Sequence, residues 1–241
     1  METTIRYTSR DARNLALLMA GGGLVLVLAY GALRAVLGDS VSKIDLFNLD
    51  SDTSLAAWFS SMQLLLVGVA FWLAARQSPA GYPLKWPFRL ASLVFVLVSA
   101  DEGIAIHERL TFQAKNLPGA QRFLFGDGHG AWIWLYLAAG LVLAAVGLRY
   151  VWFLWRYHRM ELFFMLLGAG ATGLGAVGLE LIGYSIPAGD SIYFVEVIFE
   201  ELLEMWGGSL LLYAALRLEI VAAPGLSASA FTPSPSAGAG Q

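Results

Sequence analysis

The sequence predicts an all-α, polytopic integral membrane protein that folds as a single bundle of six transmembrane helices. Hydrophobic residues make up 58% of the 241 residues and charged residues only 14%, whereas soluble domains carry about 25% charged residues. Six apolar stretches each approach or exceed the roughly 20 residues that a helix needs to span a bilayer. They cover residues 14–37, 54–76, 89–110, 131–155, 161–183 and 193–217. The connections are mostly short, so we expect one transmembrane domain over residues 1–222.

The first and last parts of the chain need separate justification. The stretch 14–37 follows three arginines, as in a signal peptide, but its apolar run exceeds the usual 7 to 15 residues and lacks a clear cleavage site, so we expect it to be retained. Residues 223–241 are rich in Ser, Ala, Gly and Pro. Such a segment has too little apolar surface to order itself, so we expect a disordered tail.

Basic residues predict the orientation of the helices, because they stay on the cytoplasmic side during insertion. They concentrate before residue 14, between 76 and 89 and between 149 and 159, whereas the connections at 39–52 and 184–192 are mainly acidic. Only Lys115 and Arg122 disagree with this alternation. We therefore expect both termini in the cytoplasm, and the inner (plasma) membrane of a bacterium as the location.

Nine ionisable residues interrupt the apolar stretches. They are Asp101, Glu102, His107, Glu108, Glu180, Glu196, Glu200, Glu201 and Glu204. A charged side chain at the centre of a membrane helix costs about 2.5 to 3.5 kcal/mol, so residues of this kind are usually functional. Helical geometry places the set in the outer half of the bilayer, with Asp101, Glu102, Glu200 and Glu201 near the midplane. We expect catalytic residues among these last four.

The same nine residues form a candidate metal site. Like charges this close together in a low dielectric cannot all stay ionised, and the predicted spans contain no lysine to neutralise them. Either protons or a cation must do so. Carboxylates with one histidine suit a divalent ion such as manganese, iron, calcium or magnesium, and zinc is a further option.

Several familiar sites are absent from the sequence. The chain has no cysteine, which excludes thiolate metal sites and cysteine nucleophiles. Neither the Glu-x-x-His pairs of di-iron bundles nor the His-Glu-x-x-His of metalloproteases occurs. The net charge of −3 and the dispersed basic residues argue against nucleic acid as a partner.

Three function classes follow from these observations. The first is a metal-dependent or acid–base enzyme acting on a membrane lipid or another lipid-soluble substrate. The second is a cation- or proton-coupled transporter or channel, in which the pairs at 101–102 and 200–201 occupy the third helix of each half, as in an inverted repeat. The third is a membrane scaffold or complex subunit whose acids make interhelical hydrogen bonds.

Overall fold

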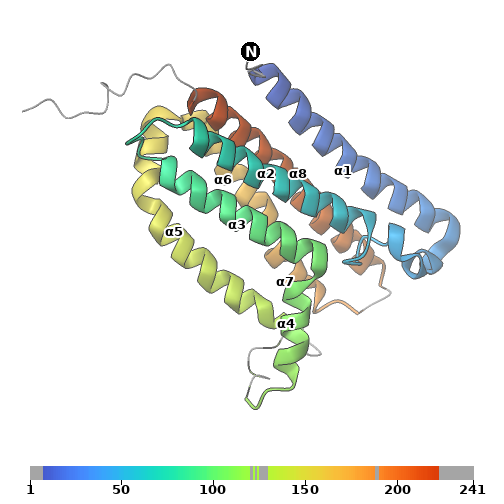
Figure 1. Ribbon diagram of the computed structural model, residues 1–241. Coiled ribbons are helices and arrows are strands. Elements are labelled where there is room, and N and C mark those ends of the chain that lie inside the picture. Colours follow the sequence, from blue (N-terminus) through green and yellow to red (C-terminus); the bar gives the residue numbers. More distant parts are fainter. Residues whose placement is uncertain (1–7, 120–121, 123, 125–129, 188–189, 223–241) are drawn as a thin grey trace, which may run out of the picture.

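The structure, a computed structural model, describes residues 8–119, 122, 124, 130–187 and 190–222. The predicted tail at 223–241 lies outside the described residues. The described ranges contain eight α-helices (Figure 1): α1 Ser9–Leu37, α2 Leu55–Gln77, α3 Lys85–Ile104, α4 Ile106–Lys115, α5 Ala131–Tyr157, α6 Arg159–Gly173, α7 Glu180–Gly183 and α8 Ser191–Ala222. A π-helical segment, Leu174–Leu179, joins α6 to α7. No strand occurs in these described ranges, so the predicted all-α class is confirmed.

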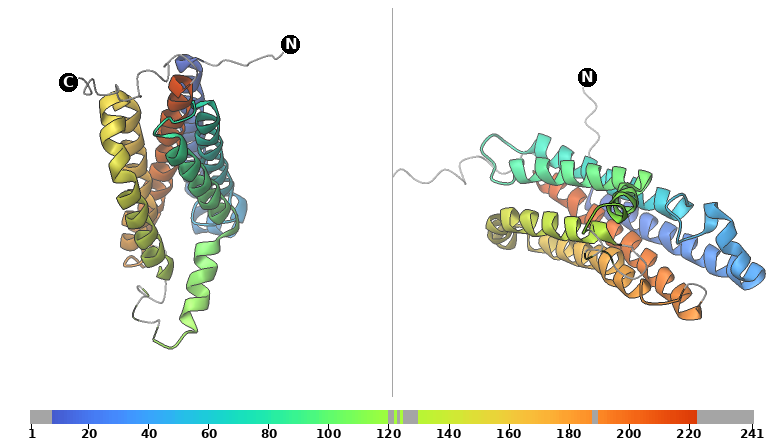
Figure 2. Two further views of the ribbon diagram at one scale, coloured as in Figure 1. Left: turned by 60° about the vertical axis from the view of Figure 1, so that its left-hand side comes forward. Right: turned by 90° about the horizontal axis from the view of Figure 1, so that it is seen from below.

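The long helices alternate in direction along one bundle (Figures 1 and 2). The start of α1, the end of α8 and the connections α2–α3 and α5–α6 gather at one end, which we call the terminal end. The opposite end holds α4 and the start of α8, and we call it the α4 end. α8 is the central helix, since it packs against α1, α2 and α6, while α3 packs on α2 and α5 contacts α4 and α6.

Four helical stretches are long and apolar enough to cross a membrane: α1, α2, α5 and the continuous run Arg159–Gly183. The pair α3–α4 would make a fifth if it is counted as one span bent by 67°. α8 has the length, at 32 residues, but carries four glutamates in its first half. Large apolar side chains such as Leu141, Val142 and Leu148 on α5 are exposed, as expected of a surface that faces lipid.

Local sequence explains where the first helices begin. The Thr8 hydroxyl accepts a hydrogen bond from the Asp11 backbone N–H, and the Asp11 carboxylate accepts one from the Thr8 N–H, which is a capping box. The Ser54 hydroxyl caps α2 by accepting from the Ala57 N–H at 3.1 Å. Both helices start within a few residues of the predicted spans.

Two predicted spans differ from the observed helices. The predicted continuous helix 89–110 is divided between α3 and α4 by a bend at Ala105, and the predicted helix 161–183 contains the π-helical segment. Neither irregularity contains a proline, so the pattern of apolar residues carries no mark of them. Both occur at the α4 end, beside the residues that the sequence marks as candidates.

Candidate functional site

The bend between α3 and α4 is made by one residue in an unusual conformation. Ala105 has φ 50° and ψ 51°. In the described ranges, every other residue with a positive φ is a glycine. An L-residue other than Asn or Asp is rarely found in this left-handed region, and such strain persists only where the surroundings impose it. Here the Ala105 N–H still bonds to the Asp101 carbonyl, which closes α3 before the chain turns.

Asp101 imposes the bend through its side chain. α4 has no capping side chain at Ala105, and the Asp101 Oδ1 atom instead accepts a hydrogen bond from the His107 backbone N–H at 2.8 Å. A carboxylate at this place also lies at the positive end of the α4 dipole. Asp101 therefore caps the helix that follows its own.

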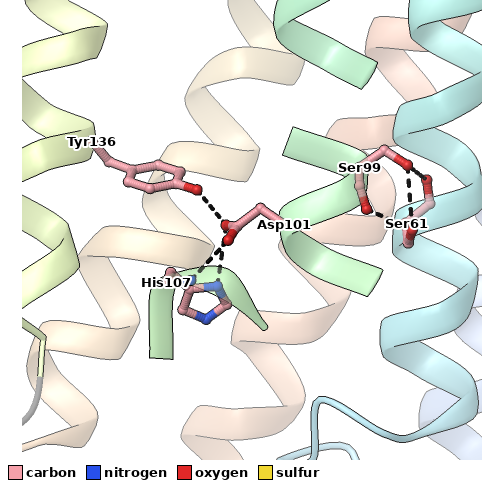
Figure 3. Close-up of polar contacts among 5 residues, drawn as sticks. All are labelled: Ser61, Ser99, Asp101, His107 and Tyr136. Carbon is pink, nitrogen blue, oxygen red and sulfur yellow. Dashed lines mark hydrogen bonds and ion pairs between the residues drawn. The ribbon is translucent and has the colours of Figure 1, made fainter. Parts of the chain in front are cut away.

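The second oxygen of Asp101 joins three helices. Asp101 Oδ2 lies 3.1 Å from His107 Nδ1 and accepts a hydrogen bond from the Tyr136 hydroxyl of α5 (Figure 3). Asp101 is only 6% exposed, so this carboxyl depends on its protein partners. We call Asp101, His107 and Tyr136 the Asp101 centre. Its Asp–His contact fixes the imidazole ring, and Figure 3 shows the other ring nitrogen pointing away from Asp101.

Neighbouring side chains hold the Asp101 centre in place. The Trp132 ring packs edge-on against His107, with centroids 5.1 Å apart, and against Tyr136 at 5.2 Å. On the other side, the Ser61 hydroxyl donates to the Ser99 carbonyl at 2.8 Å, and the Ser99 hydroxyl donates to the Ser61 carbonyl at 2.7 Å (Figure 3). This reciprocal pair fastens α3 to α2 just before Asp101.

A second group of acids lies between α7 and α8. The Tyr184 hydroxyl donates to Glu180 Oε1 at 2.5 Å, and it also takes part in a hydrogen bond with the Trp132 side chain. The carboxyls of Glu180 and Glu200 are within hydrogen-bonding reach of each other. Two carboxyls at that separation need a proton or a cation between them. Trp132 thus connects this group to the Asp101 centre.

Glu196 is the least satisfied of these acids. It is 8% exposed, neither carboxyl oxygen has a partner at ordinary hydrogen-bond geometry among the described residues, and its nearest candidates are two other acids, Glu200 and Glu180. Such a group is costly to bury unless something satisfies it. Its place against α7 exists because residue 183 is glycine: an added Cβ there would lie 3.0 Å from Glu196 Oε1.

Glycines bring α6 and α7 close to α8. An added Cβ at Gly175, inside the π-helical segment, would lie 2.8 Å from both the Glu200 carbonyl oxygen and the Glu204 Cγ atom. One at Gly168 would lie 2.8 Å from the Gly207 carbonyl oxygen. The glycines of this stretch therefore serve helix packing, and this packing carries Glu180 to the acids of α8.

The remaining predicted residues lie near these two groups. Glu102 interacts electrostatically with His107 and Asp52, while Glu201 and Glu204 interact with Glu102 and Glu180. Glu108 is exposed on α4. The structure thus places all nine predicted residues at or toward the α4 end, but in the described ranges no three His, Asp or Glu side chains come together in a way that could hold a metal ion. Metal binding by the set stays a prediction.

Sequence reasoning missed several members of the site. Tyr136 lies one helical turn after Trp132, and nothing distinguishes a single tyrosine in an apolar helix from a packing residue. In the sequence Asp50 is only one acid of the acidic connection 39–52, yet the Tyr193 hydroxyl donates to its Oδ1 at 2.9 Å. Desolvation of the carboxyl raises the pKa of Asp50, and the nearby charges of Glu180 and Glu108 add to the shift. The alternation of acidic and basic connections is the one feature of the sequence that draws attention to Asp50.

Comparison with known proteins places the chain in one family. The family model described as "Domain of unknown function (DUF8692)" matches residues 16–219. No curated protein and no solved structure matches the chain. The matched range includes the Asp101 centre and every predicted site residue, and it covers most of the 241 residues. The chain belongs to the DUF8692 family.

Proposed function

We propose that this protein is a membrane enzyme that performs acid–base chemistry on a lipid-soluble substrate, with His107 as the group that transfers the proton. The observation that carries the proposal is the Asp101 carboxyl, which holds the His107 ring and its backbone N–H at once, at a bend made by a strained residue. Backbone strain is found where it serves a mechanism more often than elsewhere.

The roles of the three residues follow from their contacts. Histidine is the side chain whose unperturbed proton affinity suits transfer near neutral pH. Asp101 orients the ring through Nδ1, which leaves Nε2 for the substrate. Tyr136 donates to the same carboxyl oxygen from α5, so it positions Asp101 and does not itself need to react.

The bundle supports six membrane crossings for this enzyme. Counting α3–α4 as one broken span and adding α8 gives the predicted six, with both chain ends of the described part at the terminal end. The central position of α8 explains how a helix with four glutamates tolerates the bilayer, because its neighbours α1, α2 and α6 separate much of it from lipid. The basic loops then support cytoplasmic termini in a bacterial plasma membrane.

The proposal is tested by lipid turnover. The purified chain is incubated in nanodiscs that contain lipids extracted from the native membrane, and the lipids are followed by mass spectrometry. We expect one lipid species to be consumed by the parent, and consumption to fall at least about 100-fold in His107→Gln and Asp101→Asn, the usual scale for loss of acid–base catalysis. His158→Gln, a buried histidine at the terminal end, is the matched control and should retain turnover. Equal turnover in His107→Gln and the parent would contradict the proposal.

A metal-dependent form of the enzyme is tested separately. The predicted divalent ion, whether manganese, iron, calcium, magnesium or zinc, would be held by carboxylates such as Glu200 and Glu201. Elemental analysis of the purified parent beside Glu200→Gln and Glu201→Gln checks this. Stoichiometric metal in the parent that is lost in a folded variant would support the metal form, and equal metal content in all three would count against it.

The row of acids on α8 favours a second candidate, proton- or cation-coupled transport. Glu196, Glu200 and Glu204 follow one another at i, i+4 spacing along the central helix, and the π-helical segment and α7 approach them through Gly175 and Gly183. Such a row is a plausible ion path. Proton or cation flux into proteoliposomes that is abolished by Glu200→Gln would support this candidate. If the chain shows neither ion flux nor lipid turnover, the membrane-scaffold class is the one that remains.

A further inference from the structure

α5 is packed at its two ends and open between them. At the α4 end Trp132 and Ile133 are buried, and at the terminal end Leu154 is buried. Residues 137–142, by contrast, are all exposed. Because successive residues of a helix point about 100° apart, six in a row cover every side of it. The side of α5 that is turned toward the bundle is therefore open here in the described part of the chain.

This open side begins at the Asp101 centre. Tyr136 reaches Asp101 from α5 (Figure 3). Gly140 and Gly147 follow Tyr136 at i+4 and i+11, so helical periodicity puts them on the same side of α5. An added Cβ at either glycine would meet no other atom of the described residues within 4 Å. On α3, Leu97 lies one turn before Asp101 and is 59% exposed. We call Leu97, Gly140 and Gly147 the open face.

The open face is apolar and as long as one lipid chain. Residues 137–148 are all Leu, Val, Ala or Gly. Residues 136 and 148 are about 18 Å apart along α5, at 1.5 Å per residue. One leaflet contributes about 15 Å to the hydrocarbon core of a bilayer, half of its roughly 30 Å. A chain that starts at the Asp101 centre, near the beginning of α5, would therefore run to about the middle of the bilayer.

A hydrocarbon chain suits the open face better than water or a second protein helix. Ordered water needs polar partners, and residues 137–148 have no polar side chain. A helix needs about 8 to 10 Å from the axis of each neighbour, whereas Tyr136 joins α5 directly to α3 at one end of the face. Carbon atoms of a lipid chain pack against a helix at about 4 Å, which the room at both glycines allows.

We infer that one hydrocarbon chain of a membrane lipid lies along the open face, with the polar head of this lipid at the Asp101 centre. The inference rests on the proposed function in one respect: the bound lipid is the substrate of His107. The His107 side chain is 19% exposed, so a head group can reach it. The substrate class is thus a lipid of the leaflet at the α4 end, and the seating of its chain between α3 and α5 positions the head for proton transfer.

A photoreactive fatty acid tests the inference without any turnover. The detergent-purified chain is mixed with hexadecanoic acid that carries a diazirine at mid-chain, and after irradiation the labelled residues are located by mass spectrometry. We expect labelling of residues 93–97 and 137–148 that saturates and that unlabelled hexadecanoic acid blocks. Labelling that rises without saturation, or that is spread evenly over the outer surfaces of the helices, would overturn the inference.

Side chains that fill the open face provide the matched variants. Gly140→Leu with Gly147→Leu adds side chains where the structure has room, so the double variant should melt like the parent. It should lower saturable labelling at least about tenfold. Ala145→Leu is the control, because Ala145 is exposed on the side of α5 opposite Tyr136, and labelling should stay unchanged. Equal saturable labelling in the double variant and the control would overturn the inference.

A disulfide test detects a second copy of the chain on the open face. The sequence has no cysteine, so Gly140→Cys produces a chain with a single thiol. After oxidation in membranes this variant should stay monomeric on a non-reducing gel, because a lipid chain covers the residue. Conversion of most of it to a disulfide dimer, beside a monomeric Ala145→Cys, would place a second copy on the open face and overturn the inference.

Failure of the inference and failure of the proposed function give different results. His107→Gln should be labelled like the parent, since His107 contacts the head of the lipid and not its chain. Saturable labelling of the open face without any His107-dependent turnover would keep the chain site and remove the enzymatic role. His107-dependent turnover that persists in Gly140→Leu with Gly147→Leu, with no saturable labelling of the parent, would keep the enzymatic role and overturn the chain site.

Discussion

Buried polar groups are paired at the terminal end of the bundle and crowded at the α4 end. At the terminal end, Arg217 Nε bonds to Glu161 Oε1 at 2.7 Å, and the Tyr82 hydroxyl lies 2.9 Å from His158 Nε2. Gln77 donates to Glu219 at 2.7 Å, although the second oxygen of Glu219 has no partner. At the α4 end, by contrast, Glu180, Glu196 and Glu200 face one another without a lysine or arginine among their main electrostatic neighbours.

This difference indicates that the polar pairs of the terminal end stabilise the fold, whereas the acids of the α4 end serve a function. An acid with a base beside it contributes to holding helices together, whereas acids gathered without bases cost stability and persist where they serve a purpose. We therefore expect loss of a polar partner at the terminal end to lower the free energy of unfolding, and substitutions at the α4 end to change activity or binding without lowering the free energy of unfolding.

Breaking the pair at the terminal end should have the largest effect. Arg217→Leu leaves the Glu161 carboxylate buried, with its side chain 6% exposed, and unpaired. We expect the free energy of unfolding to fall by about 3 kcal/mol, the lower value for breaking a buried pair because the Arg217 side chain is partly exposed. Denaturant unfolding in mild detergent measures it. The double variant Arg217→Leu with Glu161→Leu should recover most of the loss, and no recovery would contradict the account of this pair.

Loosening the Asp101 centre should have the next largest effect, on turnover. Tyr136→Phe removes the hydroxyl that donates to Asp101 but keeps the ring packed on Trp132. Turnover should fall about tenfold, equivalent to about 1.4 kcal/mol of lost positioning, with little change in thermal stability. Tyr150→Phe, a tyrosine of α5 outside the site, is the control. A loss of stability without a loss of turnover would assign Tyr136 to the scaffold alone.

Removing an unsatisfied acid should stabilise the protein. Glu196→Gln keeps the shape of the side chain but removes a buried acid that lies against the Glu180 and Glu200 carboxyls and has no basic partner among its main electrostatic neighbours. The variant should unfold at a higher denaturant concentration, with a gain of about 1 kcal/mol. The matched change Glu161→Gln should act in the opposite direction because Glu161 is paired with Arg217. A destabilised Glu196→Gln would show that Glu196 has a partner that stabilises the fold.

The smallest effect is a pH dependence at the terminal end, in the connection between α5 and α6. Burial lowers the pKa of His158 below its ordinary 6.5, so the folded chain resists taking up a proton there. The stability that neutral His158 contributes is present above pH 6.5 and is lost as the pH falls below it. Burial raises the pKa of Glu219 to about 7, which works in the opposite sense. The contribution of His158 is therefore measured as the difference in melting temperature between the parent and His158→Gln, at several pH values from 7.5 to 5.5. This difference should decrease as the pH falls. A constant difference would contradict it.

Sequence reasoning predicted the terminal end better than the α4 end. Apolar length and cap residues such as Ser54 are local signals, and they placed α1, α2 and α5 within a few residues. The bend at Ala105 has no local signal, because it depends on Asp101 reaching the His107 N–H and on Tyr136, which lies 35 residues away from Asp101. The burial of the Thr111 hydroxyl likewise depends on which helices meet there. Residue type predicted the acids, but only the packing of helices shows which of them meet.

The most direct test of the account compares one change at each end in a single lipid-turnover assay. The two variants are His107→Gln at the α4 end and the double variant Arg217→Leu with Glu161→Leu at the terminal end. Melting temperatures are measured on the same samples. We expect His107→Gln to lose turnover while it melts like the parent, and the terminal-end variant to retain turnover. Retained turnover in His107→Gln, or a loss that only follows the melting temperature, would contradict the assignment of function to the Asp101 centre.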